Sequence, residues 1–315
     1  MENLKIRSPF ISIIMATYNR AHFLEESLQY IIEQSFHDFE CLIIDDGSTD
    51  STSQIIDELC LRDSRFKYFQ RKDNYKKGLP GCRNFGLDNA KGEYVIFFDD
   101  DDIPHPKLLE WTVRKIEAHN VDYCRYLRTV FQGKFEREFN NDEEYGVKVL
   151  DSCVVEKMIC GEIPFNSCQV LWKKSCFKDL RFDENLMFAE EWECYTRILL
   201  RGSKGISLEK VLYFGRKHPN SNTGEFWNAD PIRMNSNIQA IKMVINNLKK
   251  HQLLTEKLIH YFIRWGFQFN KPEIINYTLK KSNSGIIKSL KYKIGYVFYP
   301  FLKPLFLLKK KFREA

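Results

Sequence analysis

Four consecutive aspartates at positions 99–102 are the part of this sequence that points most directly to chemistry. They follow an apolar run at residues 93–98, which places them at the end of a buried strand. Neighbouring carboxylates repel one another, and a divalent cation bridging a diphosphate relieves that repulsion with only one or two of them as ligands. Asp99 and Asp101 are therefore predicted metal ligands, and His218, which follows another strand-like run, is a third candidate.

A second group of acids has the same setting. Asp45 and Asp46 come directly after the apolar run 39–44 and open a turn that continues with Gly47 and Ser48. In open α/β sheets, ligands bind outside the carboxyl ends of the strands. We therefore expect this turn to lie at a ligand-binding edge.

A sheet must position these acids, and the first hundred residues alternate short apolar runs with helical patterns. That alternation is typical of an α/β protein with a mostly parallel central sheet wrapped by helices. The predicted strands are residues 10–15, 39–44, 66–69 and 93–98, and the predicted helices are 21–33, 51–61 and 81–90. Later patterns predict strands at 123–131, 169–172 and 210–214, a helix from Glu190, and helices across 232–284.

Composition sets limits on the class of protein. With 315 residues, 43% hydrophobic and 29% charged, the chain is long enough for a large α/β domain with a smaller appendage. Its nine cysteines form no C-x-x-C pair, and no signal-peptide pattern opens the sequence. We therefore expect reduced thiols and a cytoplasmic location, with no disulfide framework and no structural zinc.

The net charge of +6 is concentrated near the C-terminus. Residues 286–315 contain two apolar blocks, 294–299 and 305–308, with lysines around them. Neither block reaches the ~18 residues that a membrane-spanning helix needs. Pro300 and Pro304 predict two short helical pieces, which would lie in a membrane interface with their lysines at anionic headgroups. The alternative is that these blocks pack against the catalytic domain or a second subunit.

Several motifs in order along the chain resemble glycosyltransferase family 2. The motifs are residues 12–20 (SIIMATYNR), 45–50 (DDGSTD), 82–86 (CRNFG), 98–102 (FDDDD), 181–184 (RFDE) and 189–193 (AEEWE). The resemblance covers about residues 8–220. It implies a GT-A catalytic domain over 1–225, with a nucleotide-binding part at 8–105 and an acceptor part at 106–225, then a helical extension at 226–285 and the tail at 286–315.

The resemblance also implies a role for each matching residue. The loop after the first strand, with Thr17, Tyr18 and Arg20, would line the nucleotide pocket. Asp45 and Asp46 would take the base and ribose, and since a carboxylate accepts the imide N–H of uracil, the expected donor is a UDP-sugar. The remaining nucleotide-sugar contacts would come from Arg83, Asp99 and Asp100, beside Mn²⁺ or Mg²⁺ held chiefly by Asp101.

The family's general base lies in a short acidic motif, here Glu190 and Glu191. Glu191 stands where aspartate is usual, which leaves Glu190 and Glu193 as alternative bases. Crowding of like charges raises the pKa of one member of such a cluster, which suits removal of a proton from a hydroxyl. The implied reaction is metal-assisted displacement with inversion at the sugar carbon.

Two other functions stay open at this point. The acceptor would be a saccharide or lipid-linked saccharide in cell-surface polysaccharide or glycolipid synthesis, but a polyprenyl phosphate is an alternative. The second function that stays open is that of a catalytically inactive module that binds a nucleotide sugar. A dinucleotide-binding dehydrogenase is excluded because no G-x-G-x-x-G follows a strand, and no nucleic-acid partner is expected.

Overall fold

The computed structural model describes residues 9–218 and 221–314, with the side chains of residue 300 and of residues 302–314 left out. The chain divides into two compact units, Met1–Asn237 and Ile238–Ala315. The first unit contains a mixed α/β sheet structure, and the second is helical. The predicted fold class, a mostly parallel central sheet followed by C-terminal helices, is confirmed.

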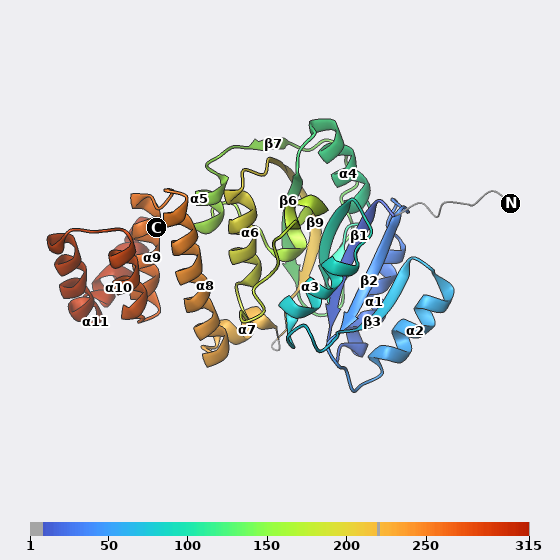
Figure 1. The fold of residues 1–315 in the computed structure, drawn as a ribbon, viewed down its shortest axis with the longest axis horizontal. Coiled ribbons are helices and arrows are strands. Elements are labelled where there is room, and N and C mark those ends of the chain that lie inside the picture. Colours follow the sequence, from blue (N-terminus) through green and yellow to red (C-terminus); the bar gives the residue numbers. More distant parts are fainter. Residues whose placement is uncertain (1–8, 219–220, 315) are drawn as a thin grey trace. The chain divides into compact units, whose positions relative to one another are not determined.

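The amino-terminal half of the sheet is parallel (Figure 1). Its strands are β1 (Ile11–Thr17), β2 (Phe39–Asp45), β3 (Phe66–Gln70) and β4 (Tyr94–Asp99), in the spatial order β3-β2-β1-β4. β1 lies between β2 and β4 and pairs with both in parallel, so the carboxyl ends of these strands meet at one edge. The four strands predicted for this region are confirmed to within two residues at each end.

Beyond β4 the sheet becomes mixed. It continues through β8 (Val170–Lys173), β6 (Tyr123–Phe131), β9 (Gly205–Arg216) and β5 (Ile103–Pro104), and β7 (Val147–Leu150) pairs with β9. β8 is antiparallel to both β4 and β6, and β6 is parallel to β9. β9 therefore runs in the same direction as β4 and ends at the same edge of the sheet.

The two faces of the sheet are covered by different helices, because successive side chains of β1 point to opposite faces. Ile13 and Met15 join a core with α1 (Ala21–Ile32), α2 (Thr52–Arg62) and α4 (Leu108–His119). Ile14 faces α3 (Leu79–Asn89), where a Cβ on Gly86 would lie 2.4 Å from Ile14 Cγ2. Glycine at this position lets α3 lie close against β1.

The later part of the first unit contains α5 (Val154–Ile159), α6 (Glu190–Leu200) and α7 (Asn222–Trp227), with short 3₁₀ turns at Ser167–Gln169 and Lys174–Phe177. α6 begins at Glu190, as the sequence predicts, directly after Ala189, whose φ is 63°. The first turn of α6 holds three glutamates, and Cys194, Tyr195 and Ile198 bury its apolar side. α6 thus carries an acidic N-terminus on a well-anchored helix.

The second unit contains most of α8 (Pro231–Lys250) together with α9 (Glu256–Gln268), α10 (Pro272–Lys281) and α11 (Ile286–Glu314). The helices predicted across residues 232–284 are thereby confirmed. Apolar residues of α9 and α10 form a small core against which Tyr292 and Tyr296 of α11 pack. The boundary between the units, after Asn237, falls inside the helical extension predicted at 226–285.

The expectation that prolines would divide the C-terminal segment is wrong. One helix, α11, runs from Ile286 to Glu314 through both Pro300 and Pro304. Each proline removes one backbone hydrogen bond at a cost of roughly 3 kcal/mol, which favours a break but which a long helix can absorb as a bend. Across the described helices, none is both long and apolar enough to cross a membrane. The side chains of the predicted block 305–308 lie outside the described part of the chain.

Candidate active site

Three predicted site residues meet at the carboxyl ends of β1, β2 and β4. Thr17 is paired with Asp45 in the register of β1 and β2, and Ala16 is paired with Asp99 in that of β1 and β4. Because β9 runs in the same direction, its last residues also arrive at this edge, and His218 follows two residues later. The acidic motifs thus form a row along one sheet edge.

Asp45 organises the turn that follows β2. Its Oδ1 accepts hydrogen bonds from the backbone N–H groups of Gly47 and Ser48 at 3.0 and 2.8 Å, and from the Ser48 hydroxyl at 2.7 Å. Its Oδ2 accepts a hydrogen bond from the Tyr68 hydroxyl at 2.7 Å. Both carboxylate oxygens are therefore engaged within the protein, and the turn they hold lies beside the first-strand loop, where the Asn19 N–H donates to the Ser48 hydroxyl.

Asp46 joins two later segments to the same edge. Its Oδ1 accepts a hydrogen bond from Arg71 Nε at 2.5 Å, and its Oδ2 accepts one from the backbone N–H of Gly78 at 2.8 Å, just before α3. The Lys77 ammonium lies 4.6 Å from the centre of the Tyr18 ring, and 45% of Tyr18 is exposed. Tyr18 therefore presents an accessible aromatic surface beside positive charge, which suits a nucleotide.

The aspartates after β4 are crowded with like charge. Burial and the negative charge of Asp101 raise the pKa of Asp100 to about 8, although Arg20 Nε approaches Asp100 Oδ1 at 3.8 Å. Burial also raises the pKa of Asp99, and Asp101 adds to that rise while Arg83 opposes it. Because both pKa values are raised, the arginines present do not fully neutralise this cluster.

Asp101 and Asp102 have different partners. The Asp101 carboxylate lies 2.6 Å from His218 Nε2, so the structure brings together two of the three predicted metal ligands. Asp102 is buried and accepts a hydrogen bond from the backbone N–H of Arg216 at 2.6 Å, and its other oxygen lies 3.3 Å from Arg128. Asp102 thus links the last residue of β9 to the segment that follows β4 by a hydrogen bond.

Arg83 of α3 links the two acidic motifs. Its guanidinium donates to Glu190 Oε1 at 2.8 Å and lies 3.5 Å from Asp99 Oδ1. The group is buried, with its central carbon 5.8 Å from the Phe97 ring centre and 5.6 Å from that of Phe182. A buried guanidinium packed beside two aromatic rings and near two carboxylates has little freedom, so Arg83 holds the aspartate run close to the start of α6.

The three candidate bases on α6 are not equivalent. Glu190 is held by Arg83, and Glu193 is held by Arg197, whose Nε and Nη2 lie 2.7 and 2.6 Å from its two oxygens. The Glu191 carboxylate has no side-chain partner among the residues that the structure describes. Burial, followed by the charge of Glu190, raises the pKa of Glu191 to about 8. Glu191 is therefore the carboxylate best prepared to accept a proton near neutral pH.

Two sets of residues at this edge are candidates for holding a metal. Over the described ranges, side-chain ligand atoms of Asp99, Asp102 and Cys168 lie within 4.8 Å of one another. However, burial raises the pKa of the Cys168 thiol well above its ordinary value, so the sulfur stays protonated and is a poor ligand. The oxygens of Asp102 are already committed to arginine contacts.

The second set consists of Asp99, Asp101 and His218, as the sequence predicts. Carboxylate oxygens suit Mg²⁺ and Mn²⁺, and an imidazole nitrogen is a common additional ligand for transition metals. A cation here would also offset the negative charge of Asp101, which adds to burial, the larger cause, in raising the pKa values of Asp99 and Asp100. The chemistry of these donors and their excess negative charge suit a hard divalent ion, although among the described residues their three ligand atoms do not gather within 4.8 Å as those of the first set do.

Sequence reasoning missed three residues that support this edge. Arg128 of β6 and Arg216 of β9 both contact Asp102, and the Tyr213 hydroxyl accepts a hydrogen bond from the Asp99 N–H at 3.0 Å. An arginine inside a buried strand is a detectable signal, because an unpaired charge there is costly. Its partner could not be read from the sequence, because the contact joins segments 26 and 114 residues apart.

This fold, with its acidic sheet edge, is that of a GT-A type glycosyltransferase, and comparison with known proteins agrees. The family model "Glycosyl transferase family 2" matches residues 12–167. The chain belongs to glycosyltransferase family 2, and the expected family is confirmed. The match covers the aspartate run and Arg83 but ends before α6.

Two curated bacterial relatives are similar over about two thirds and just over half of the chain. Glycosyltransferase GlyG of Streptococcus pneumoniae is 28% identical over 68% of this chain and 73% of its own length. The GalNAc(5)-diNAcBac-PP-undecaprenol beta-1,3-glucosyltransferase of Campylobacter jejuni is 34% identical over 56% of this chain and 55% of its own length. The chain therefore spans only about half of the latter protein.

Solved structures share the fold at lower identity. TarS of S. aureus (residues 1–349), solved with UDP, has a TM-score of 0.63 and 20% identity, covering 84% of this chain and 73% of its own. The mannosyltransferase PcManGT of Pyrobaculum calidifontis, solved with GDP-Man and Mn²⁺, has a TM-score of 0.55 and 15% identity, covering 94% of this chain and 86% of its own. These likenesses support the GT-A fold.

Proposed function

We propose that this protein is an inverting glycosyltransferase that moves a sugar from a UDP-sugar to an acceptor hydroxyl. The observation that carries the proposal is the arrangement around Arg83, which touches both Asp99 and Glu190. The aspartate run needed at a nucleotide diphosphate and the acidic N-terminus of α6 are thereby held beside one another. Glu191 stands at this junction with a raised pKa and no side-chain partner among the described residues.

The proposed donor site is the sheet edge from Tyr18 to Asp101. Tyr18 offers a face for the base, and the Asp46 region offers a carboxylate that can accept the imide N–H of uracil. Relatives of the same fold support a nucleotide sugar, since TarS was solved with UDP and with UDP-GlcNAc, and PcManGT with GDP-Man. Arg20 and Arg83 would brace the phosphates or the aspartates beside them.

In the proposed reaction, Glu191 accepts the proton of the acceptor hydroxyl. The acceptor oxygen forms a bond to the anomeric carbon while the bond from that carbon to the diphosphate oxygen breaks, and the electron pair leaves with the nucleotide. Attack from the face opposite the leaving group inverts the configuration. Mn²⁺ or Mg²⁺ bound by Asp99, Asp101 and His218 would supply Lewis-acid stabilisation of the diphosphate. Arg83 would hold Glu190 in place beside the base.

The proposed acceptor is a saccharide or a lipid-linked saccharide of a cell-surface polysaccharide or glycolipid. One relative is named for glucosyl transfer in a series carried on undecaprenol diphosphate. The nine cysteines are all free thiols in the structure, which is compatible with work at the cytoplasmic face of a membrane. A lipid-linked acceptor would bring the enzyme to that surface.

The decisive experiment is a donor screen with purified protein, in which nucleotide release from UDP- and GDP-sugars is measured with and without Mn²⁺. We expect a UDP-sugar to be hydrolysed slowly and to be consumed faster when an acceptor saccharide is added. Absence of release from every donor, with or without metal, would identify an inactive binding module. Transfer to a polyprenyl phosphate alone would identify the other acceptor class, and product NMR would settle the anomeric outcome.

A further inference from the structure

The outer face of α11 is apolar and exposed over the part whose side chains are described, residues 286–299 and 301. Its inner face packs on α9 and α10 through Tyr292 and Tyr296, and the Tyr296 hydroxyl donates to Asn270 Oδ1 at 2.6 Å. On the outer side the large apolar residues are exposed over 48–87% of their surface, namely Ile286, Ile287, Leu290, Ile294, Val297, Phe298 and Phe301. Such a continuous apolar strip on the surface usually marks a contact site.

The spacing of these residues makes one stripe. At about 100° per residue, the seven side chains fall within an arc of about 120°. Lys291 and Lys293 fall about 20° beyond its two edges. The stripe is therefore bordered by an ammonium group on each side, which is the pattern of a helix that lies in a membrane interface with its lysines at the headgroups.

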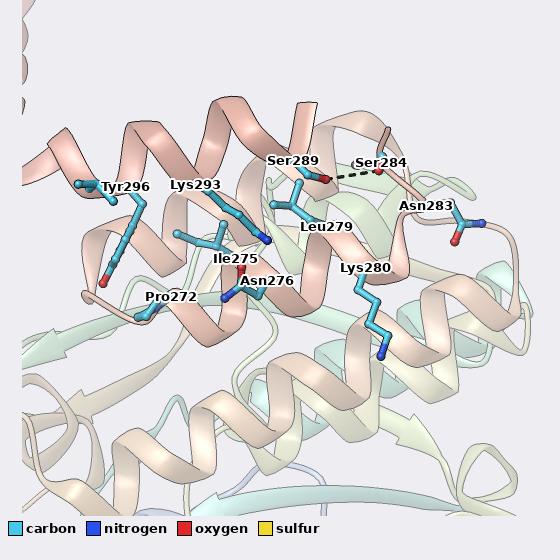
Figure 2. Close-up of a pocket in the computed structure, with 11 residues that line it drawn as sticks. Pro272, Ile275, Asn276, Leu279, Lys280, Asn283, Ser284, Ser289, Lys293 and Tyr296 are labelled. Atoms are coloured by element: carbon cyan, nitrogen blue, oxygen red, sulfur yellow. Dashed lines mark hydrogen bonds between the residues drawn. The ribbon is translucent and has the colours of Figure 1, made fainter. Parts of the chain in front are cut away.

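Beside the stripe lies a groove between α10 and α11 with a volume of about 670 Å³ (Figure 2). Ile275 and Leu279 give it apolar walls, and Lys280 and Lys293 are among its lining residues. Val297 belongs both to this groove and to the stripe. The groove thus extends the surface with further apolar area and a second basic residue.

Charge in the second unit favours an anionic partner. Residues 238–315 contain sixteen lysines and arginines and three acidic residues, whereas residues 1–237 contain an excess of acids. Of those three, Glu256 is already paired with Lys288 at 2.6 Å. A second copy of the chain fits less well, because in a helix pair the lysines that border each stripe would face lysines of the other helix.

We infer that the outer face of α11, with the adjoining groove, is a docking surface for a bilayer that contains anionic lipid. α11 lies along the bilayer plane with the stripe in the headgroup region and its lysines at lipid phosphates. The role of this contact, which is to hold the enzyme beside lipid-linked acceptors, rests on the proposed function. The contact itself does not depend on catalysis.

The test is flotation of the full chain with vesicles of phosphatidylcholine alone or mixed with phosphatidylglycerol. Wild-type protein should float with the mixed vesicles and at least about ten-fold less with the neutral ones. Leu290→Glu/Ile294→Glu should lose flotation, since it places two acids on the stripe. Leu61→Glu/Val149→Glu, at exposed positions of the first unit, is the matched control and should float like wild type.

Lys291→Gln/Lys293→Gln should reduce flotation with the mixed vesicles, and the control Lys134→Gln/Lys250→Gln should not. Equal flotation of wild type and Leu290→Glu/Ile294→Glu would overturn the inference. So would a wild-type dimer in solution that this variant converts to a monomer, since the stripe would then be a subunit interface. Nucleotide release without vesicles, measured in parallel, should be the same for wild type and variant, so a failure of the proposed transferase activity is scored independently.

Discussion

At the scale of single residues, Arg83 determines what its acidic neighbours can do. Its buried guanidinium is shared between Glu190 and Asp99, which lie on different elements. Glu190 is thereby neutralised by a partner, whereas Glu191 is left with a raised pKa. Two adjacent glutamates thus have different tasks, one holding α6 in place and the other open to a substrate.

Glu191→Gln should leave UDP and Mn²⁺ binding intact while lowering turnover by about 10²–10⁴-fold, because the variant cannot accept a proton. Calorimetric titration with UDP and an assay of sugar transfer would measure the two effects. Glu190→Gln is the informative comparison. It removes the charge opposite a buried arginine and should lower the free energy of unfolding by about 3 kcal/mol. A stable but inactive Glu190→Gln protein would move the base to that residue.

The rate should also depend on pH through Glu191. A base works only when deprotonated, so kcat/KM should rise with pH and level off above the pKa of this carboxyl, which burial and Glu190 raise to about 8. A cation beside Asp99 removes part of the repulsion, so the midpoint in the presence of metal should lie at or somewhat below that value. The rising limb should be absent from the residual activity of Glu191→Gln.

Asp101→Asn tests the metal site. The amide is nearly isosteric and can still meet His218, but it lacks the charge that a cation requires, so transfer should fall by at least about 100-fold while the fold is kept. Far-UV circular dichroism and the Mn²⁺ dependence of nucleotide release would be compared with wild type. Activity at the wild-type level would show that Asp101 is not a metal ligand.

At the scale of elements, the position of Arg83 depends on how closely α3 lies on β1. Gly86→Ala would put a methyl group 2.4 Å from Ile14 Cγ2, and we expect it to cost about 1–3 kcal/mol in urea unfolding. Gly285→Ala meets no atom within 4 Å and is the control that should be close to neutral. Combining Gly86→Ala with Ile14→Ala, which removes the Cγ2 atom, should cost less than the sum of the two single changes. If it does not, the two side chains are not in conflict.

Elements whose pattern is local were predictable, and contacts between distant segments were not. The alternation of apolar runs before Asp45 and Asp99 was sufficient to predict parallel strands that end in acids. The engagement of both Asp45 oxygens by its own turn and by Tyr68 needed three-dimensional information. The reading of Pro300 as a break failed because local propensity was outweighed by a long helix whose inner face packs through Tyr292 and Tyr296.

At the scale of the whole molecule, acidic and basic residues are divided between the two units. The catalytic unit carries the excess of acids, and the helical unit carries sixteen basic residues against three acids. The isoelectric point of about 8.7 is therefore an average of two unlike parts. In the proposed function, the acids at the sheet edge serve a metal and a diphosphate, and basic residues of the helical unit serve the proposed lipid contact.

This division predicts the salt dependence of vesicle binding. Raising NaCl from about 0.1 to about 1 M shortens the Debye length from about 10 to about 3 Å, so the bound fraction on phosphatidylglycerol vesicles should fall steeply. Sedimentation at several salt concentrations would measure it. Binding that is unchanged or stronger at high salt would show that apolar burial alone holds the protein there.

The contact between Asp101 and His218 has a consequence for how an ion enters the site. Their side chains already satisfy one another at 2.6 Å, so a cation that takes both as ligands has to separate them first. Binding of the cation then replaces the contact between Asp101 and His218 with two coordination bonds. The apparent affinity of the cation is lower than those two bonds alone would give. This cost is the same for every divalent ion, so it lowers all their affinities alike, and any preference for Mn²⁺ over Mg²⁺ would come from the imidazole ligand itself.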